Sequence, residues 1–324
     1  MKNQITILFL FVVCFAVLSM YVVETPVAET LETLKLDMHA GYRVDQLDWN
    51  IAGLNSSGQY VNVLSELDWE DLEIWQLGVA GKLAFANTKG PIRIYTRASI
   101  DYGWITGGTT RDSDYQGNNR TQESYRSFND TEDDNVFDTS IGIGFEKDLW
   151  QNRLTLGLLG GYSYHEQNLR LTNLLVVIVN GAILQPSRPF PGLNSTYETQ
   201  WRGPFIGLDF KLDPFPRISL SGSVEYHWSD YEAEADWNLR EEWAHPLSFR
   251  HDTDEADGLV VSLKGSYLIS AGWLLDLTYL YRDFSAGDGL YRLFPAVGTP
   301  VDSKFNEANW RSSAITLGVT YKFK

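Results

Sequence analysis

Hydrophobic and polar residues alternate one by one over several long segments of the chain. The same alternation appears in segments 137–146, 259–269 and 273–282. A period of two residues is typical of β-strands that have one apolar and one polar face. The C-terminal segment shows it most clearly, with large apolar residues at every second position: Ile315, Leu317, Val319, Tyr321 and Phe323.

The two faces of these predicted strands differ in an unusual way. The apolar face carries aromatic residues near its ends, whereas the other face mixes Gly, Ser and Thr with charges of both signs. This arrangement fits a transmembrane β-barrel, which is apolar outside and polar inside. The alternative is a soluble lipocalin-like barrel or a secreted sandwich, for which the inverted polarity would need another explanation.

Short and long connections alternate between the predicted strands, as they do in outer-membrane barrels with short periplasmic turns and longer external loops. We therefore predict an all-β fold, an antiparallel transmembrane β-barrel of about ten strands with long extracellular loops. The predicted strands are 33–44, 63–86, 91–106, 134–148, 153–172, 196–212, 217–234, 257–269, 272–287 and 307–323. The predicted long loops are 45–62, 107–133, 173–195, 235–256 and 288–306.

The N-terminus has the composition of a secretory signal peptide. Lys2 precedes an apolar stretch over 5–23, and polar sequence begins directly after it. We predict a signal peptide over 1–28 and one barrel domain over 29–324; the alternative is an uncleaved membrane anchor. The single cysteine, Cys14, lies inside the signal peptide, so the mature chain is predicted to have no disulfide.

Composition narrows the range of partners. Asp and Glu outnumber Lys and Arg by 42 to 26, which gives a net charge of −16. This balance argues against nucleic-acid binding, because that needs a basic face. The predicted partner is outer-membrane lipid, in the bacterial outer membrane at the cell surface. No cofactor is predicted, and the sequence leaves the oligomeric state open.

The lumen of a ten-stranded barrel is narrow. About eight strands enclose only enough room for side chains, and ten add little. The inward positions carry charges of both signs, which predicts a buried salt-bridge network. A narrow channel is the alternative reading of the same lining. The inward charged candidates are Arg93, Arg97, Asp101, Glu146, Asp209, Lys211, Glu225, Lys264, Asp276 and Arg282.

The segment "RDSDY" places two carboxylates two residues apart, at Asp112 and Asp114. In an extended strand such residues point to one side, about 7 Å apart. The pair could position a water molecule or bind a cation. Further acids follow at Asp130, Glu132, Asp133 and Asp134, and this density raises calcium binding as an alternative. The spacing matches no EF-hand loop, so no metal site is predicted.

Several motifs resemble those of the omptins, a family of outer-membrane proteases on ten-stranded barrels. An "LDW" stretch at 67–69 is followed one hairpin later by Asp-x-Asp-aromatic at 112–115, and segments 157–164 and 203–210 are similar to omptin strands. The phrases "YRVDQLDWNIAG" and "NVLSELDWEDLEIWQLG" resemble the protochlamydial outer membrane protein group even more. For that group the resemblance implies location and fold, with no established chemistry.

The omptin resemblance implies catalytic positions. Its Asp-x-Asp pair matches Asp112 and Asp114, and its Asp-x-His pair, which polarises the attacking water, matches Asp236 and Asn238. Asn238 replaces the histidine and cannot take up a proton at neutral pH. We therefore expect a surface protein with a structural, adhesive or interaction role that has lost proteolysis.

Two alternatives to that function stay open. The first is an aspartyl endopeptidase that cleaves near basic residues, with His245 or His251 folding back to Asp236. The resemblance then implies that Asp45 and Glu234 bind the basic substrate side chain. The second is a narrow channel. Lipopolysaccharide is a further candidate partner, although the basic residues that omptins use for it are not matched on the fifth predicted strand.

Overall fold

The computed structural model describes residues 31–85 and 91–323, which form an all-β structure. The predicted signal peptide over 1–28 lies outside these residues, and Cys14 with it. Within the described ranges, no helix is long and apolar enough to cross a membrane. The strands are β1 (Leu31–Leu54), β2 (Tyr60–Phe85), β3 (Ile92–Gly117), β4 (Thr121–Thr131), β5 (Asp134–Leu149), β6 (Leu154–Val179), β7 (Ala182–Phe190), β8 (Ser195–Phe215), β9 (Ile218–Asp236), β10 (Phe249–Ser270), β11 (Trp273–Ala286), β12 (Gly289–Leu293) and β13 (Val301–Phe323).

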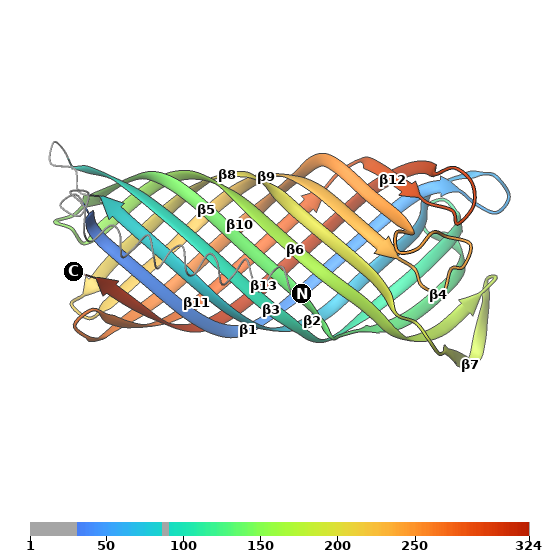
Figure 1. Ribbon diagram of the computed structural model, residues 1–324, viewed down its shortest axis with the longest axis horizontal. Helices are drawn as coiled ribbons and strands as arrows, with labels where there is room; N and C mark the ends of the chain where they lie inside the picture. Colours follow the sequence, from blue (N-terminus) through green and yellow to red (C-terminus); the bar gives the residue numbers. More distant parts are fainter. Residues whose placement is uncertain (1–30, 86–90, 324) are drawn as a thin grey trace.

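The strands close into an antiparallel ring of about ten positions (Figure 1). β1 pairs with both β2 and β13, so the first and last strands complete the ring. β4 and β5 share one position between β3 and β6, and β12 continues β11 between β10 and β13. The hairpin of β6 and β7 projects from one end of the ring. The predicted ten-stranded barrel is confirmed.

The alternation along each strand separates an apolar outer face from a polar lumen. On β13, Leu317 is 62% exposed whereas its neighbour Thr316 is 5% exposed. Rings of outward aromatic side chains, here called girdles, border this apolar band, as in other membrane barrels. One girdle comprises Tyr42, Trp75, Trp104, Tyr162, Tyr226, Trp228 and Tyr279, and the other comprises Phe145, Phe215, Tyr267, Trp273 and Phe323.

The two ends of the barrel differ. The short connections at 150–153, 216–217 and 271–272 lie at the same end as the start of β1 and the end of β13; we call it the turn end. Beyond the girdle at the opposite end, the loop end, the strands continue as a collar. The collar comprises the strand segments and connections within 45–72, 107–131, 166–202, 229–256 and 284–312.

The sequence predicted long loops over 45–62 and 107–133, but most of these residues form strands of the collar. β1 and β2 leave only 55–59 between them, and β3 and β4 leave only 118–120. Above the girdle the outer face meets water rather than lipid, so the apolar-outside pattern used to place strands disappears there. The hydrogen-bonded ladder continues without it, because strand pairing depends on the backbone.

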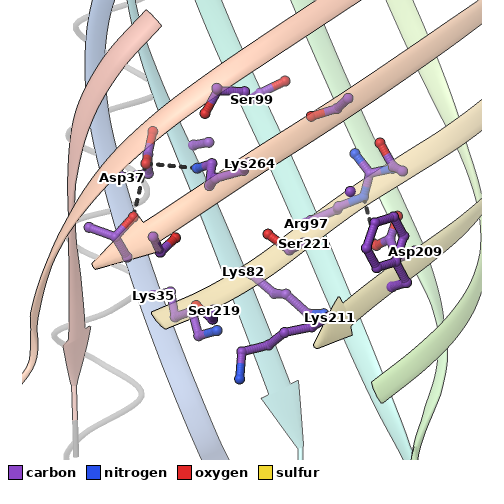
Figure 2. Close-up of a pocket in the computed structure, with 18 of the residues that line it drawn as sticks. Lys35, Asp37, Lys82, Arg97, Ser99, Asp209, Lys211, Ser219, Ser221 and Lys264 are labelled. Atoms are coloured by element: carbon purple, nitrogen blue, oxygen red, sulfur yellow. Dashed lines mark hydrogen bonds and ion pairs between the residues drawn. The ribbon is translucent and has the colours of Figure 1, made fainter. Parts of the chain in front are cut away.

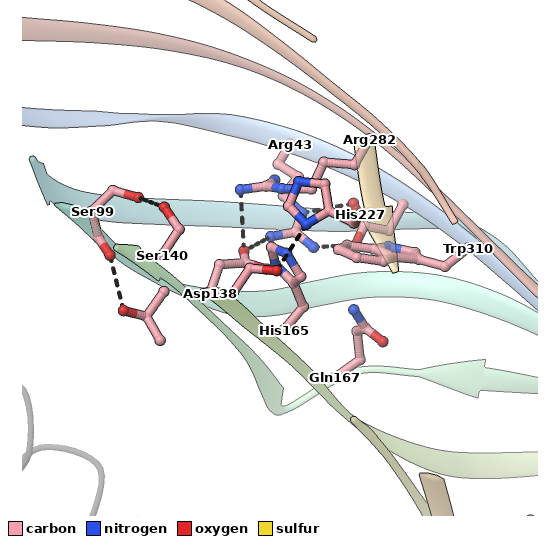
Figure 3. Close-up of polar contacts among 12 residues, drawn as sticks. Arg43, Ser99, Asp138, Ser140, His165, Gln167, His227, Arg282 and Trp310 are labelled. Atoms are coloured by element: carbon pink, nitrogen blue, oxygen red, sulfur yellow. Dashed lines mark hydrogen bonds and ion pairs between the residues drawn. The ribbon is translucent and has the colours of Figure 1, made fainter. Parts of the chain in front are cut away.

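A lumen network of buried charges ties the strands together in the middle of the barrel (Figure 3). Arg43 is fully buried and donates to Asp45 through Nε at 2.7 Å and to Asp138 through Nη1 at 2.5 Å. His165 Nδ1 lies 2.7 Å from Asp138 Oδ1, and Arg282 Nη2 lies 3.5 Å from Asp138 Oδ2. Residues of β1, β5, β6 and β11 therefore meet at a single carboxylate.

Other inward charges, nearer the turn end, are also paired across the lumen. These pairs support the salt-bridge reading of the lining, because charges of both signs cancel in a space too narrow for full hydration. The pairs are Arg97 with Asp209 and Glu225, Lys264 with Asp37, and Lys82 with Glu146.

An aromatic plug fills the lumen on the loop-end side of this network. Trp201 and Tyr231 lie 4.4 Å apart between ring centroids, and Trp69 stacks on Tyr197 at 5.1 Å. A filled lumen argues against the narrow-channel alternative. The plug comprises Trp49, Trp69, Tyr197, Trp201, Tyr231, Phe249, Phe284, Phe305 and Trp310, all buried.

The apolar band predicts a strong position effect of charge. Leu317→Arg places a guanidinium in lipid and should lower the free energy of unfolding in lipid vesicles by about 2–4 kcal/mol. Val297→Arg is the control, since Val297 is 91% exposed in the connection after β12 and should change stability by less than about 0.5 kcal/mol. Equal effects of the two variants on urea unfolding would contradict the assigned membrane band.

The lumen network predicts a second effect. Arg43→Met leaves the buried carboxylate of Asp45 without a cationic partner and removes one of the partners of Asp138, so the free energy of unfolding should fall by about 3–5 kcal/mol. The exposed pair of Arg292 with Asp302 provides the matched control, and Arg292→Met should leave stability nearly unchanged, because an exposed ion pair contributes little. Denaturant titration of both variants measures the difference, and a negligible effect at Arg43 would show that the network does not hold the barrel together.

Candidate functional site

Asp112 and Asp114 lie on β3 in the collar and face the lumen side of the wall. Asp112 is opposite Leu67 and Asp114 is opposite Ser65 on β2. Leu67 is 1% exposed and belongs to the apolar core, so its cross-strand partner points inward as well. Both aspartates are partly buried. The expectation that the two carboxylates share one side of the strand is met.

Burial raises the pKa of Asp112 well above its ordinary range, and the nearby charge of Asp114 raises it further. The pKa of Asp114 is also raised by burial, against the opposing effects of a hydrogen bond from Ser65 and of the charge of Arg240. Two carboxyl groups this close cannot both ionise freely, because like charges in a poorly hydrated site disfavour each other. The pair is therefore built to retain a proton.

Arg240 comes from the connection between β9 and β10, which folds back over the mouth of the barrel. Its charge acts on both aspartates, and its guanidinium carbon lies 5.3 Å from the ring centroid of Trp243. Sequence reasoning missed Arg240. It lies 126 positions after Asp114 in a segment without strand periodicity, so no pattern in the sequence indicated the contact.

Asp236 is paired with an imidazole, as one alternative required. Its Oδ1 lies 2.5 Å from Nδ1 of His245, and both side chains are partly exposed. Asn238 does not join them. Its amide oxygen accepts from the backbone N–H of Asn194 at 2.8 Å, and its Nδ2 donates to the Gly192 carbonyl at 2.7 Å. Asn238 thus fastens the connection between β7 and β8.

Alternation along β9 places Asp236 on the opposite side of the wall from the Asp112–Asp114 pair. Tyr231, Ala233 and Ala235 are at most 2% exposed and face the lumen. Asp236 has the other parity and is directly opposite Thr196, the neighbour of the fully buried Tyr197 on β8. The two halves expected from the omptin resemblance therefore do not face a common groove through their strand positions.

The two acids expected to bind a basic substrate side chain occupy different environments. Asp45 is fully buried in the lumen network, where Trp310 Nε1 donates to its Oδ2 at 2.9 Å in addition to the two bonds from Arg43. Glu234 lies on the outer face of β9 and is paired with Arg250. Neither carboxylate lies beside Asp112.

His251, the second imidazole considered for Asp236, packs against the aromatic plug instead. Its Nδ1 lies 2.9 Å from the Tyr197 hydroxyl, and its ring centroid lies 4.7 Å from that of Phe305. Burial lowers the pKa of His251 to about 3, so its ring is neutral at physiological pH.

The acids considered for calcium binding are also dispersed. Asp130 accepts from Asn173 Nδ2 at 2.8 Å, whereas Asp112 and Asp114 face the lumen side. Across residues 31–85 and 91–323, no three His, Cys, Asp or Glu side chains are grouped so that they could hold a metal ion.

Comparison with solved structures identifies the architecture. The outer membrane protease OmpT from Escherichia coli superposes with a TM-score of 0.69 at 15% identity, over 90% of this chain and 97% of that one. A FadL homologue and OprG, both from Pseudomonas aeruginosa, give TM-scores of 0.32 and 0.31 at 10% and 12% identity. The FadL homologue pairs 90% of this chain with 90% of its own, and OprG pairs 89% with 95%. The similarity to OmpT shows a shared fold.

The sequence itself matches a family model. No curated protein sequence matches the chain significantly. Residues 37–323 match the model described as Protochlamydia outer membrane protein, and this range includes every complete barrel strand after β1. The turn end is accordingly assigned to the periplasm and the collar to the cell surface, following the rule for short turns. The chain belongs to the Protochlamydia outer membrane protein family and is an outer-membrane β-barrel with an omptin-like fold.

Proposed function

We propose that this barrel is a non-proteolytic surface protein whose collar binds a partner outside the cell. The observation that carries the proposal is the position of Asn238, which stands where the omptin resemblance requires the catalytic histidine. Its amide is used to fasten the β7–β8 connection. An amide neither takes up nor releases a proton at neutral pH, so it cannot serve as the general base.

Two features of the collar suit an interaction role. The β6–β7 hairpin carries exposed apolar side chains, with Ile183 68% and Phe190 42% exposed. β7 is hydrogen-bonded only to β6 among the described strands, which leaves one edge free to pair with another chain.

Proteolysis is the second candidate, and one contact favours it. The 2.5 Å contact between His245 and Asp236 has the geometry of a base oriented by a carboxylate. An endopeptidase would need the His245–Asp236 pair to act together with Asp112 and Asp114. The strand β9, however, directs Asp236 to the other side of the barrel wall.

Lipopolysaccharide does not enter the proposal. Two outward basic side chains of the collar already have acidic partners, with Arg111 bound to Asp68 and Arg250 bound to Glu234. A phosphate-bearing headgroup would have to displace these carboxylates.

A peptidase assay separates the two candidates. The protein refolded in detergent should leave fluorogenic peptides with paired basic residues uncut, at the rate of the buffer blank. Asn238→His should stay equally inactive, because the β7–β8 connection and the orientation of β9 do not bring residue 238 to the acid pair. Cleavage that disappears in both Asp112→Ala and His245→Ala would establish the endopeptidase and reject the proposal.

The acid pair also predicts a dependence of stability on pH. The folded-state pKa of Asp112 is raised above its ordinary value of 3.8, so the native state binds more protons and stability falls as pH rises through that window. Asp112→Asn removes this loss. The variant should match the wild type near pH 4 and be more stable at pH 8, as measured by urea unfolding.

The control for this experiment is Asp302, whose pKa is shifted in the opposite direction to that of Asp112. Arg292 lowers the pKa of Asp302, so the charged form is favoured in the native state. Asp302→Asn should therefore give a slightly less stable protein at pH 8 and no difference well below pH 4. If Asp112→Asn followed the same trend as this control, the pair would not be held protonated.

A further inference from the structure

A cavity of about 770 Å³ occupies the lumen between the lumen network and the periplasmic end of the barrel. It lies apart from the collar and from the acid pair. Its size falls within the range of small-molecule sites, which is about 300–1,000 Å³. Figure 2 shows that side chains from β1, β2, β3 and β8 converge on this space.

The lining of the cavity is basic in an acidic protein. It contains nine Lys and Arg against seven Asp and Glu, an excess of two positive charges, whereas the whole chain carries −16. The net charge of the lining is therefore opposite in sign to that of the whole chain. A net positive charge in a cleft of low dielectric constant favours anions there.

The basic residues are arranged in a row. Lys35 on β1 is directly opposite Lys322 on β13 and Lys82 on β2, and Lys82 is in turn opposite Arg97 on β3. All four line the cavity. Residues directly opposite on neighbouring strands have Cβ atoms about 5 Å apart, and like charges at such positions are destabilising. The row thus carries an unfavourable interaction that a bound anion would relieve.

Only part of this row is neutralised by the protein. Arg97 binds Asp209 and Glu225, and Lys82 Nζ lies 2.6 Å from Glu146 Oε2. For Lys35 and Lys322, the described part of the chain provides no ion pair. The acids deeper in the cavity are already occupied, as Asp37 is by Lys264 at 2.9 Å.

Hydroxyl groups lie on another wall of the cavity. Ser219 and Ser221 of β9 line the same space as Lys35, and Figure 2 labels both among the lining side chains. Ammonium groups bind phosphate as point charges, and hydroxyl groups donate hydrogen bonds to its remaining oxygens. Such a site suits a ligand with more than one negative charge, since two lysines lack partners.

We propose that the periplasmic cavity is a binding site for a phosphate-bearing anion, held by Lys35 and Lys322 with support from Lys82. The anion has two sources with the same chemistry, a soluble phosphate compound in the periplasm or the headgroup of an anionic lipid. The lining of the cavity reaches the turn-end connections at Pro216 and Gly272. The site is independent of the collar, so it does not rest on the function proposed above.

Calorimetric titration of the purified full barrel in a zwitterionic detergent with inorganic pyrophosphate tests the soluble source. We expect binding that weakens as salt rises. Lys35→Gln and Lys322→Gln should each reduce the affinity by about tenfold or more, since each removes a charge-assisted contact. The control is Lys304→Gln, which removes a basic residue paired with Asp288 at the opposite end and should leave binding unchanged.

Reconstitution into nanodiscs with a minority of phosphatidylglycerol tests the lipid source. Enrichment of phosphatidylglycerol around the wild type, lost in the Lys35→Gln/Lys322→Gln double variant, would assign the site to a headgroup. The Lys35→Gln and Lys322→Gln substitutions both remove like-charge repulsion, so the variants should fold. The heat-dependent change of the barrel's mobility in gel electrophoresis checks that they do. The proposal fails if neither ligand binds, or if binding is equal in the wild type and the folded double variant.

Discussion

The closed ring of strands follows from one constraint, that a membrane offers no water to backbone N–H and C=O groups. Within lipid these groups must bond to one another, and a sheet does this completely only when its first and last strands meet. The pairing of β1 with β13 meets that requirement. The outward apolar face, the girdles and the inward polar face all follow from the closure, because alternate side chains must then serve two different solvents.

Closure with about ten strands also determines what the lumen can contain. The space is too narrow for fully hydrated charges, so inward acids and bases must satisfy one another across it. Asp138 is paired with Arg43, Arg282 and His165 for this reason. Towards the cell surface, the aromatic plug fills the narrow lumen. Towards the periplasm the lumen contains the cavity, and there the cancellation of charge is incomplete at Lys35.

The sequence predicted the transmembrane part well, because its strands separate lipid from a polar lumen and therefore alternate. Leu317 and Thr316 could be assigned to opposite faces by parity alone. Above the girdle this contrast is lost, and 107–117 and 121–131 were read as loop although they are strand. The same-side geometry of Asp112 and Asp114 followed from local spacing. The contacts of Asn238 and Arg240 did not, since they depend on the path of the long connection between β9 and β10.

The meeting of β1 and β13 has a consequence for biogenesis. The residues that pair, such as Leu34 with Phe323, are separated by nearly the whole chain. Contacts of such large sequence separation form late, because the entropy of bringing the ends together is lost before any bond is gained. Until β13 is in place, β1 presents an open edge that can pair with other chains. Assembly of this barrel therefore requires that its exposed first strand be protected for as long as the last strand is missing.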